Sequence, residues 1–244
     1  MGRTGSYGRG DDIARAESRG GETPPLRNPP RGVNNQGRAR YNLNMRNRIG
    51  IFGGTFDPPH LGHLILASEA LRQLELGRLL WVLTPQSPHK LEQEITPLED
   101  RLEMVRRAIA DEPTFELSTI EFERPAPQYM VDTLGILQEA NPGAELILLM
   151  GADSVMTLDT WHRPADLLNA CHEIGVMRRP GEEIQPAELE SIVPGLMTKV
   201  RIVEAPLLQI SSREIRRRAA GGIDFRYFVP TKVYEYIRSQ KLYP

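Results

Sequence analysis

The segment 53–63, which reads GGTFDPPHLGH, constrains this chain of 244 residues more than any other part of it. It follows a short apolar run at 49–52 and precedes a stretch whose apolar residues recur at helical spacing. The pattern predicts a first β-strand that turns into a first helix, and open α/β sheets bind nucleotides at such turns. Paired glycines let a backbone approach a ligand closely, and the start of a helix offers N–H groups to phosphate.

Two histidines, His60 and His63, stand three residues apart and so share one face of the first helical turn. A zinc site is one alternative, but the segment lacks the Glu and the third ligand of the helical metalloprotease motif, and Gly62 suggests close approach to a ligand. A purely structural pair is another alternative. The spacing G-x-G-x-x-G is absent after the strand, which disfavours a dehydrogenase. Because the zinc-binding motif is incomplete, we expect that the protein itself holds no metal ion.

Strand and helix patterns alternate along the rest of the chain, which predicts an α/β fold with a doubly wound, mostly parallel sheet. The segment beginning at Ser211 and Ser212 has two hydroxyl residues suited to capping a helix, and it ends at two glycines. Further strands are expected at 79–84, 115–122, 145–150, 173–177 and 199–203, and helices at 98–110 (with a charged outer face), 130–139 and 211–220.

The composition separates a tail at 1–46 from one α/β domain at 47–244. The first 44 residues contain eight Arg and eight Gly but few apolar residues, so they cannot bury enough surface to offset chain entropy, and we expect disorder. They match neither a secretory signal nor a transit peptide. Met45 stands just before the first strand, so the tail is either an over-extended start or a genuine basic appendage.

Net charge, cysteine content and hydrophobicity limit the kinds of partner and compartment that we expect. The formal net charge of −2 gives no indication of nucleic-acid binding. Cys171 is the single cysteine, so an internal disulfide is impossible and a reducing cytoplasm fits. No apolar run approaches the roughly 20 residues that span a bilayer. These properties lead us to expect a cytoplasmic protein that binds neither nucleic acid nor membrane, and an oligomer is compatible with the sequence.

Two motifs carry a resemblance to a known family. The segment 53–63 resembles the H-x-G-H signature of the nucleotidyltransferase superfamily, and 210–216, ISSREIR, looks like its second motif, I-S-S-T-x-I-R. Within the superfamily the chain is most similar to the bacterial nicotinate-nucleotide adenylyltransferases, from residue 48 to the C-terminus. Arg213 stands where that family often has Thr. Further matching segments are 88–90, 151–154 with Leu158 and Trp161, 177–181, and 229–230 to 242–243.

The resemblance implies a Rossmann-like nucleotidyltransferase fold and transfer of the adenylyl group of ATP, with Mg²⁺, to nicotinate mononucleotide, giving deamido-NAD and pyrophosphate in NAD biosynthesis. The acceptor phosphate is largely ionised at pH 7, so the reaction needs cations and donors rather than a strong base. The implied catalytic residues are His60, His63 and Arg216, and the implied ATP- and phosphate-binding residues are Gly53, Gly54, Thr55, Phe56, His89, Lys90, Asp153, Ser211 and Ser212.

For the acceptor, the resemblance implies that Trp161 stacks on the pyridine ring and that the backbone of Thr133 meets its carboxylate. The alternatives are a core position for Trp161 and, for Asp153, an N-cap role instead of a ribose contact. The loop with His89 and Lys90 is otherwise a solvated turn, and we expect the neighbours of Arg216 to form a solvated helix face. Alternative functions are a pantetheine-phosphate adenylyltransferase and a non-catalytic nucleotide-binding regulator.

Overall fold

The structure, a computed structural model, describes residues 47–86, 95–177, 186–206 and 208–244. The predicted tail at 1–46 and the loop with His89 and Lys90 lie outside the described residues, and so does most of the 177–181 segment. Six strands form one sheet in the order β3-β2-β1-β4-β5-β6, and all neighbouring strands are parallel. This is the doubly wound order, with a switch point between β1 and β4. The predicted fold class is confirmed.

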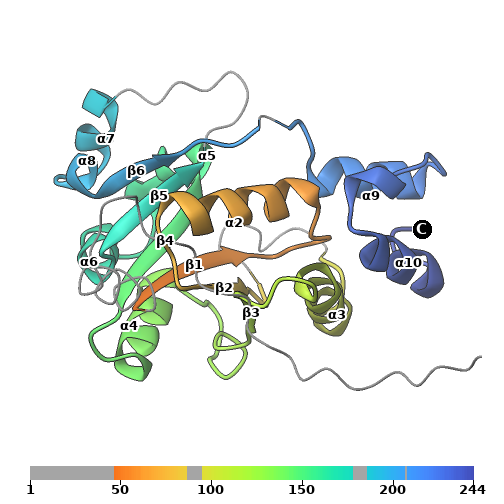
Figure 1. Cartoon of the computed structure of the whole chain (residues 1–244), viewed down its shortest axis with the longest axis horizontal. Coiled ribbons are helices and arrows are strands. Elements are labelled where there is room, and N and C mark those ends of the chain that lie inside the picture. The colour runs from red at the N-terminus through yellow and green to blue at the C-terminus, as the bar shows by residue number, and fades with distance from the viewer. Residues whose placement is uncertain (1–46, 87–94, 178–185, 207) are drawn as a thin grey trace, which may run out of the picture.

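The strands and helices follow one another along the chain (Figure 1). The strands are β1 (Arg48–Gly54), β2 (Arg78–Leu83), β3 (Phe115–Ser118), β4 (Glu145–Gly151), β5 (Glu173–Met177) and β6 (Val200–Val203). The helices are α2 (Leu61–Gln73), α3 (Leu98–Ile109), α4 (Met130–Ala140), α5 (Ala152–Val155), α6 (Pro164–Ala170), α7 (Pro186–Ile192), α8 (Leu196–Lys199), α9 (Ser212–Ala220) and α10 (Thr231–Gln240). Two short 3₁₀ turns are η2 (Leu158–Thr160) and η3 (Arg226–Phe228).

Each face of the sheet has its own core. Successive side chains of a strand point to opposite faces, so Leu80 and Val82 of β2 pack with α4 and α6, whereas Leu79 and Trp81 pack with α2 and α3. The central strand β4 is buried along five consecutive residues, as a strand covered on both faces must be. Helix α2 crosses one face of the sheet, as Figure 1 shows.

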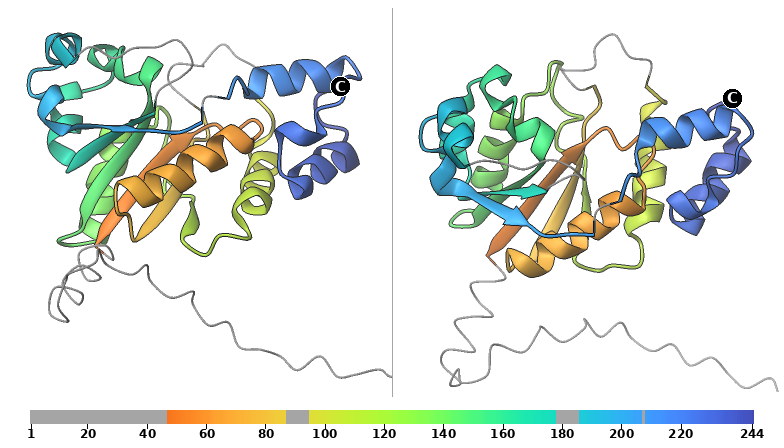
Figure 2. Two further views of the ribbon diagram at one scale, coloured as in Figure 1. Left: turned by 45° about the horizontal axis from the view of Figure 1, so that its top comes forward. Right: turned by 90° about the horizontal axis from the view of Figure 1, so that it is seen from above.

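A third apolar cluster joins the C-terminal helices to the sheet domain. Ile215 of α9 packs with Met104 of α3 and with Val233 and Ile237 of α10. Phe225 and Val229, between the two C-terminal helices, complete the buried set. Figure 2 shows α9 and α10 together beside α3, close to the N-terminal end of α2. The C-terminus therefore lies near the turn between β1 and α2.

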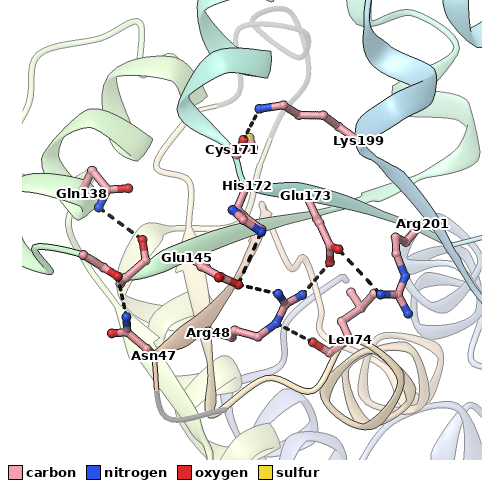
Figure 3. A network of polar contacts seen from close by, with 12 residues as sticks. Asn47, Arg48, Leu74, Gln138, Glu145, Cys171, His172, Glu173, Lys199 and Arg201 are labelled. Atoms are coloured by element: carbon pink, nitrogen blue, oxygen red, sulfur yellow. Dashed lines mark hydrogen bonds and ion pairs between the residues drawn. The ribbon is translucent and has the colours of Figure 1, made fainter. Parts of the chain in front are cut away.

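A polar network ties the opposite end of the sheet together (Figure 3). Arg48 at the start of β1 pairs with Glu145 of β4 and Glu173 of β5, and its Nε donates to the carbonyl of Leu74 at 3.0 Å. Glu173 also lies 3.6 Å from Arg201 of β6. This network is at the amino ends of the strands, whereas the switch-point site is at their carboxyl ends.

Most predicted elements agree with the structure to within a residue or two, and the differences have local causes. Strand β3 ends at Ser118 rather than at 122, because Phe122 N–H donates to the Thr119 carbonyl at 2.8 Å and closes a turn. Lys199 belongs to α8, so β6 begins one residue later than predicted. Sequence periodicity did not reveal the short helices α5 to α8 or helix α10. No helix of the described segments is long and apolar enough to cross a membrane.

Candidate active site

The start of α2 is closed by its two histidines. His60 is the N-cap, and its Nδ1 accepts the backbone N–H of His63 at 3.4 Å. In the reciprocal bond, the Nδ1 of His63 accepts the backbone N–H of His60 at 3.2 Å. The two rings stack with centroids 3.7 Å apart. This is a capping box made by two imidazoles, and it occupies N–H groups that we had expected the helix start to offer to phosphate.

The capping box fixes the protonation of both rings. A neutral imidazole has one N–H and one bare nitrogen, and a nitrogen that accepts a backbone N–H is the bare one. The proton of each neutral ring is therefore on Nε2, the atom on the far side of the ring from the helix backbone. Each histidine can thus act as a hydrogen-bond donor through Nε2 without leaving its capping position.

Two glycines of the motif make room for its own side chains. A Cβ at Gly62 would lie 3.0 Å from Nδ1 of His60, and a Cβ at Gly54 would lie 3.0 Å from the ring of Phe56. Gly62 therefore makes room for the His60 ring, and its role as a point of close ligand approach stays a prediction. Phe56 itself has φ of 45°, a strained value that places its buried ring edge-on to His63 at 5.2 Å.

A cavity of about 830 Å³ opens at the carboxyl ends of the central strands. This volume is within the range of small-molecule sites, and the switch point is where doubly wound sheets bind ligands. Of the predicted site residues, five line the cavity: Gly53, Gly54, Thr55, Asp153 and Trp161. The carboxyl groups in its wall belong to Glu121 and Asp153.

Trp161 and Asp153 occupy the cavity wall in different ways. Trp161 is partly buried against the core under α4 and α6 and also lines the cavity, and its stacking on the pyridine ring stays a prediction. Beside it the rings of Tyr129 and His162 stack at 4.0 Å. Asp153 is inside α5, whose N-cap is Gly151, so the capping alternative for Asp153 is wrong.

Helix α9 brings the second motif to the first. Ser211 is its N-cap and accepts the N–H of Glu214 at 3.2 Å, as predicted. Ser212 Oγ donates to the carbonyl of Pro58 at 2.9 Å, and Arg216 Nη1 donates to the carbonyl of Asp57 at 2.6 Å. The two motifs, about 150 residues apart in the sequence, are therefore joined at the 57–58 turn.

The neighbours of Arg216 only partly fit the prediction of a solvated helix face. Arg217 is exposed and pairs with Glu214 at 2.8 Å. Arg218 instead lies over the ring of Phe228, 4.6 Å from its centroid, and donates to the Asp224 carbonyl at 3.0 Å. Arg218 therefore stabilises the turn between α9 and η3, and for this residue the prediction was wrong.

Thr133 lies behind the cavity rather than in its wall. It is fully buried, its N–H donates to the Tyr129 carbonyl at 3.2 Å, and its hydroxyl donates to Glu121 Oε1 at 2.7 Å. Arg124 Nη2 donates to the same hydroxyl at 2.5 Å. Thr133 therefore reaches the cavity through Glu121. Burial raises the pKa of Glu121, and the hydrogen bond from Thr133 opposes that shift.

Sequence reasoning missed two charged residues under the site. Asp57 is 5% exposed and Arg101 of α3 is 2% exposed. Arg101 stands on the apolar side of its helix, three residues from Leu98 and from Met104, and a charge in that position is a signal that periodicity could have used. Asp57 is in the first motif, yet nothing in the local pattern marks it as buried. Both therefore belong to the framework of the site.

The family model described as Cytidylyltransferase-like matches residues 51–218, which include both motifs, so the chain belongs to this class of nucleotidyltransferases. In the described residues, no group of three or more His, Cys, Asp or Glu side chains could hold a metal ion.

Individual relatives narrow the family further. A protein of Thermomicrobium roseum named "Probable nicotinate-nucleotide adenylyltransferase" is 43% identical over 196 residues, which cover 80% of this chain and 91% of that protein. A protein of the same name from Geobacillus thermodenitrificans is 42% identical, covering 80% of this chain and 86% of the relative. The chain therefore belongs to the nicotinate-nucleotide adenylyltransferase family, and the resemblance stated from the sequence is confirmed.

Solved structures agree on the fold. The nicotinic acid mononucleotide adenylyltransferase of Plasmodium falciparum complexed with NaAD superimposes with a TM-score of 0.68 at 19% identity, covering 81% of this chain and 97% of that one. The same enzyme complexed with APC gives a TM-score of 0.66 at 20% identity, again over 81% and 97% of the two chains.

Proposed function

We propose that the protein transfers the adenylyl group of ATP to nicotinate mononucleotide. An oxygen of the acceptor phosphate attacks the α-phosphorus of ATP, the bond from that phosphorus to the bridging oxygen breaks, and pyrophosphate leaves with the electron pair. The products are deamido-NAD and pyrophosphate. The relatives from Thermomicrobium and Geobacillus that share this name support the assignment.

The triphosphate would lie over the joined motifs. His60 and His63 would donate from Nε2 to oxygens on the α-phosphorus, where charge builds in the transition state. The backbone at 53–56 would approach the nucleotide. The guanidinium of Arg216 and the start of α9 at Ser211 and Ser212 would meet the leaving pyrophosphate. His89 and Lys90, which the resemblance also assigns to phosphate, stay predictions.

The nucleotide substrate would be the magnesium complex of ATP. Mg²⁺ prefers oxygen ligands and usually keeps several waters, so a triphosphate supplies much of its coordination. Two carboxyl groups, of Glu121 and Asp153, face the cavity, which suits a metal that arrives with its substrate. When bound, the ion would neutralise charge on the leaving pyrophosphate.

The cavity would take the acceptor. Its volume suits a mononucleotide, Trp161 would stack on the pyridine ring, and Asp153 would accept a ribose hydroxyl. Gln128 and Glu121 each have a buried oxygen without a hydrogen-bond partner in the described part of the chain. Such atoms favour a polar ligand in this wall. Thr133, which is buried behind it, would act by holding Glu121 rather than by direct contact.

One observation carries the proposal. The capping box fixes two stacked imidazoles with their Nε2 protons directed away from the helix backbone, at the turn whose glycines line the cavity. Capping uses only the two Nδ1 atoms, and it fixes both rings so that their Nε2 N–H groups can serve as the donors in fixed positions that phosphoryl chemistry needs.

The test is pyrophosphate release with ATP and three acceptors: nicotinate mononucleotide, its amide, and phosphopantetheine. A site built for the acid has donors that pair with a carboxylate, and the amide would leave one of them facing another donor. We expect kcat/KM for the acid to exceed that for the amide by about 10²-fold or more. Preference for phosphopantetheine, or equal use of the acid and the amide, would refute the acceptor assignment. Absence of turnover with all three would favour a nucleotide-binding regulator.

The stacking role of Trp161 has its own test. Trp161→Ala should raise KM for the acid and the amide by a similar factor, because stacking does not sense the ring substituent. Tyr227→Ala removes an aromatic ring that is 80% exposed, and it serves as the control. A change in the acid-to-amide ratio of more than about tenfold would assign Trp161 to recognition of the carboxylate instead.

A further inference from the structure

The carboxylate of Asp57 is a buried junction of three segments. Its Oδ1 accepts the hydroxyl of Tyr243 at 2.8 Å, and its Oδ2 accepts the backbone N–H of Thr96 at 3.3 Å. The same Oδ2 lies 3.8 Å from Nη1 of Arg216. The contacts come from the C-terminus, from the residues before α3, and from α9. Asp57 therefore connects the first motif to three parts of the chain that surround it.

The C-terminal segment takes an unusual path to reach Asp57. Lys241, the C-cap of helix α10, has φ of 53°, and Tyr243 has φ of 61°. Both values are in the left-handed region that residues other than glycine avoid, at a cost of about 1 kcal/mol or more each. Strain of this kind persists when surrounding contacts require it. Here it directs the Tyr243 ring back into the apolar cluster under α9 and its hydroxyl onto Asp57.

The hydroxyl of Tyr243 stays a donor at every physiological pH. Burial raises its pKa, and the charge of Asp57 raises it further. Its hydrogen bond and that of Thr96 together spread the charge of the carboxylate over two donors. Asp57 therefore attracts the guanidinium of Arg216 less strongly than a bare buried carboxylate would.

The turn at Asp57 contacts the guanidinium of Arg216 through a single nitrogen, Nη1. Both of its contacts to Asp57, at 2.6 Å to the carbonyl and 3.8 Å to the carboxylate, are made by Nη1. Its side chain is 33% exposed, so the guanidinium is accessible from outside. A stronger pull from the carboxylate would convert the 3.8 Å contact into a bidentate ion pair and turn the fork away from a phosphate ligand.

We infer that Tyr243 and Asp57 are positioning residues, and that the hydrogen bond between them keeps Arg216 available to the triphosphate of ATP. The C-terminal segment is thus part of the nucleotide site although it does not line the cavity. This inference rests on the proposed function for the role of Arg216, and it adds a partner that neither motif contains.

A double-mutant cycle tests it, with steady-state KM for ATP and for the acceptor as the readout. Tyr243→Phe keeps the ring and removes the donor, so the carboxylate should capture Arg216 and KM for ATP should rise about tenfold, the scale of one hydrogen bond to a charged group. KM for the acceptor should change less than about twofold on the same reasoning. In the background Asp57→Asn, which has no charge to capture Arg216, adding Tyr243→Phe should leave KM for ATP nearly unchanged.

The chain offers a matched control. Tyr236 of α10 donates to Asp100 of α3 at 2.7 Å, a bond of the same kind that does not touch the first motif. Tyr236→Phe should lower the thermal midpoint about as much as Tyr243→Phe does and leave both KM values unchanged. Equal effects of the two variants on KM for ATP would overturn the inference. Additive effects of Tyr243→Phe and Asp57→Asn, or failure of Tyr243→Phe to fold, would also overturn it.

The wild-type assay separates this test from the proposed function. Turnover of ATP with nicotinate mononucleotide establishes the reaction, whatever the variants do. If wild type prefers another acceptor, the cycle is repeated with that acceptor, because the inference concerns only the ATP side. If no acceptor is used, equilibrium binding of ATP to the same four variants gives the comparison.

Discussion

The most consequential prediction concerns Arg101, the buried cation of α3. Its guanidinium donates to four backbone carbonyls in the two turns that follow β1 and β2 and just before α3. The distances are 3.1 Å to Thr55, 2.8 Å to Thr84, 2.7 Å to Pro85 and 2.9 Å to Thr96. Since Thr55 and Thr84 line the cavity, Arg101 holds two of its walls at once. Burial lowers the pKa of Arg101 and the charge of Asp57 opposes that shift, yet an arginine stays protonated in proteins.

The perturbation is Arg101→Met, which keeps side-chain length and removes every donor. Four buried carbonyls left without a partner would cost about 4–12 kcal/mol at 1–3 kcal/mol each if nothing relaxed. Water entering the vacated space recovers part of this cost, and the desolvation cost of the guanidinium disappears. Loss of one partner from a buried charged network costs about 3–5 kcal/mol. We expect a loss of that size in the free energy of unfolding, with Arg101→Lys intermediate.

Urea unfolding at pH 7 gives the measurement, with an unchanged m value as the condition for comparison. Arg107→Met is the control, because Arg107 is on the same helix but partly exposed, pairs with Glu103 and lies over Tyr236. The control should cost no more than about 1 kcal/mol. If Arg101→Met is within about 1 kcal/mol of the control, the four carbonyls are not held by this side chain and the reasoning fails.

Two further predictions concern the histidine pair and Glu121. His63→Ala should lower kcat by roughly 10² to 10³ through loss of a transition-state donor and cost about 1 kcal/mol of stability through loss of the cap; kcat close to wild type in pyrophosphate release, with circular dichroism showing a folded chain, would leave His63 with capping alone. Glu121→Gln should make stability less dependent on pH. Because burial raises the folded-state pKa of Glu121 above its unfolded value, the contribution of Glu121 to wild-type stability should be fully present below the ordinary carboxyl pKa of about 4.3 and be lost as pH rises through the folded pKa. Thermal midpoints of the two proteins should therefore diverge from acid toward neutral pH, and parallel curves would count against a buried, shifted carboxyl.

The sequence by itself determined the doubly wound, mostly parallel sheet and the family, whereas the order of the strands came from the structure. These depend on local signals: apolar runs of strand length, helical periodicity in α2 and α3, and hydroxyl residues at the start of α9. The two motifs are also short continuous stretches of sequence, so each can be recognised without knowing where the fold places it. Short helices such as α5 and α6 escaped because four to seven residues are too few for a periodic pattern to emerge.

Only the tertiary structure decided which residues support the site. Tyr243 and Asp57 are 186 positions apart, and Arg216 and Asp57 are 159 apart, so no window of sequence contains either pair. Likewise the role of Gly62 depends on where the His60 ring lies. The packing of α4 buries Thr133 completely, so this residue lies behind the cavity wall rather than in it. Burial of a polar side chain is a property of the whole fold, because what covers the side chain comes from distant segments. For that reason the motifs lead to a prediction of the donors of this site, whereas the residues that hold those side chains in place could be found only in the structure.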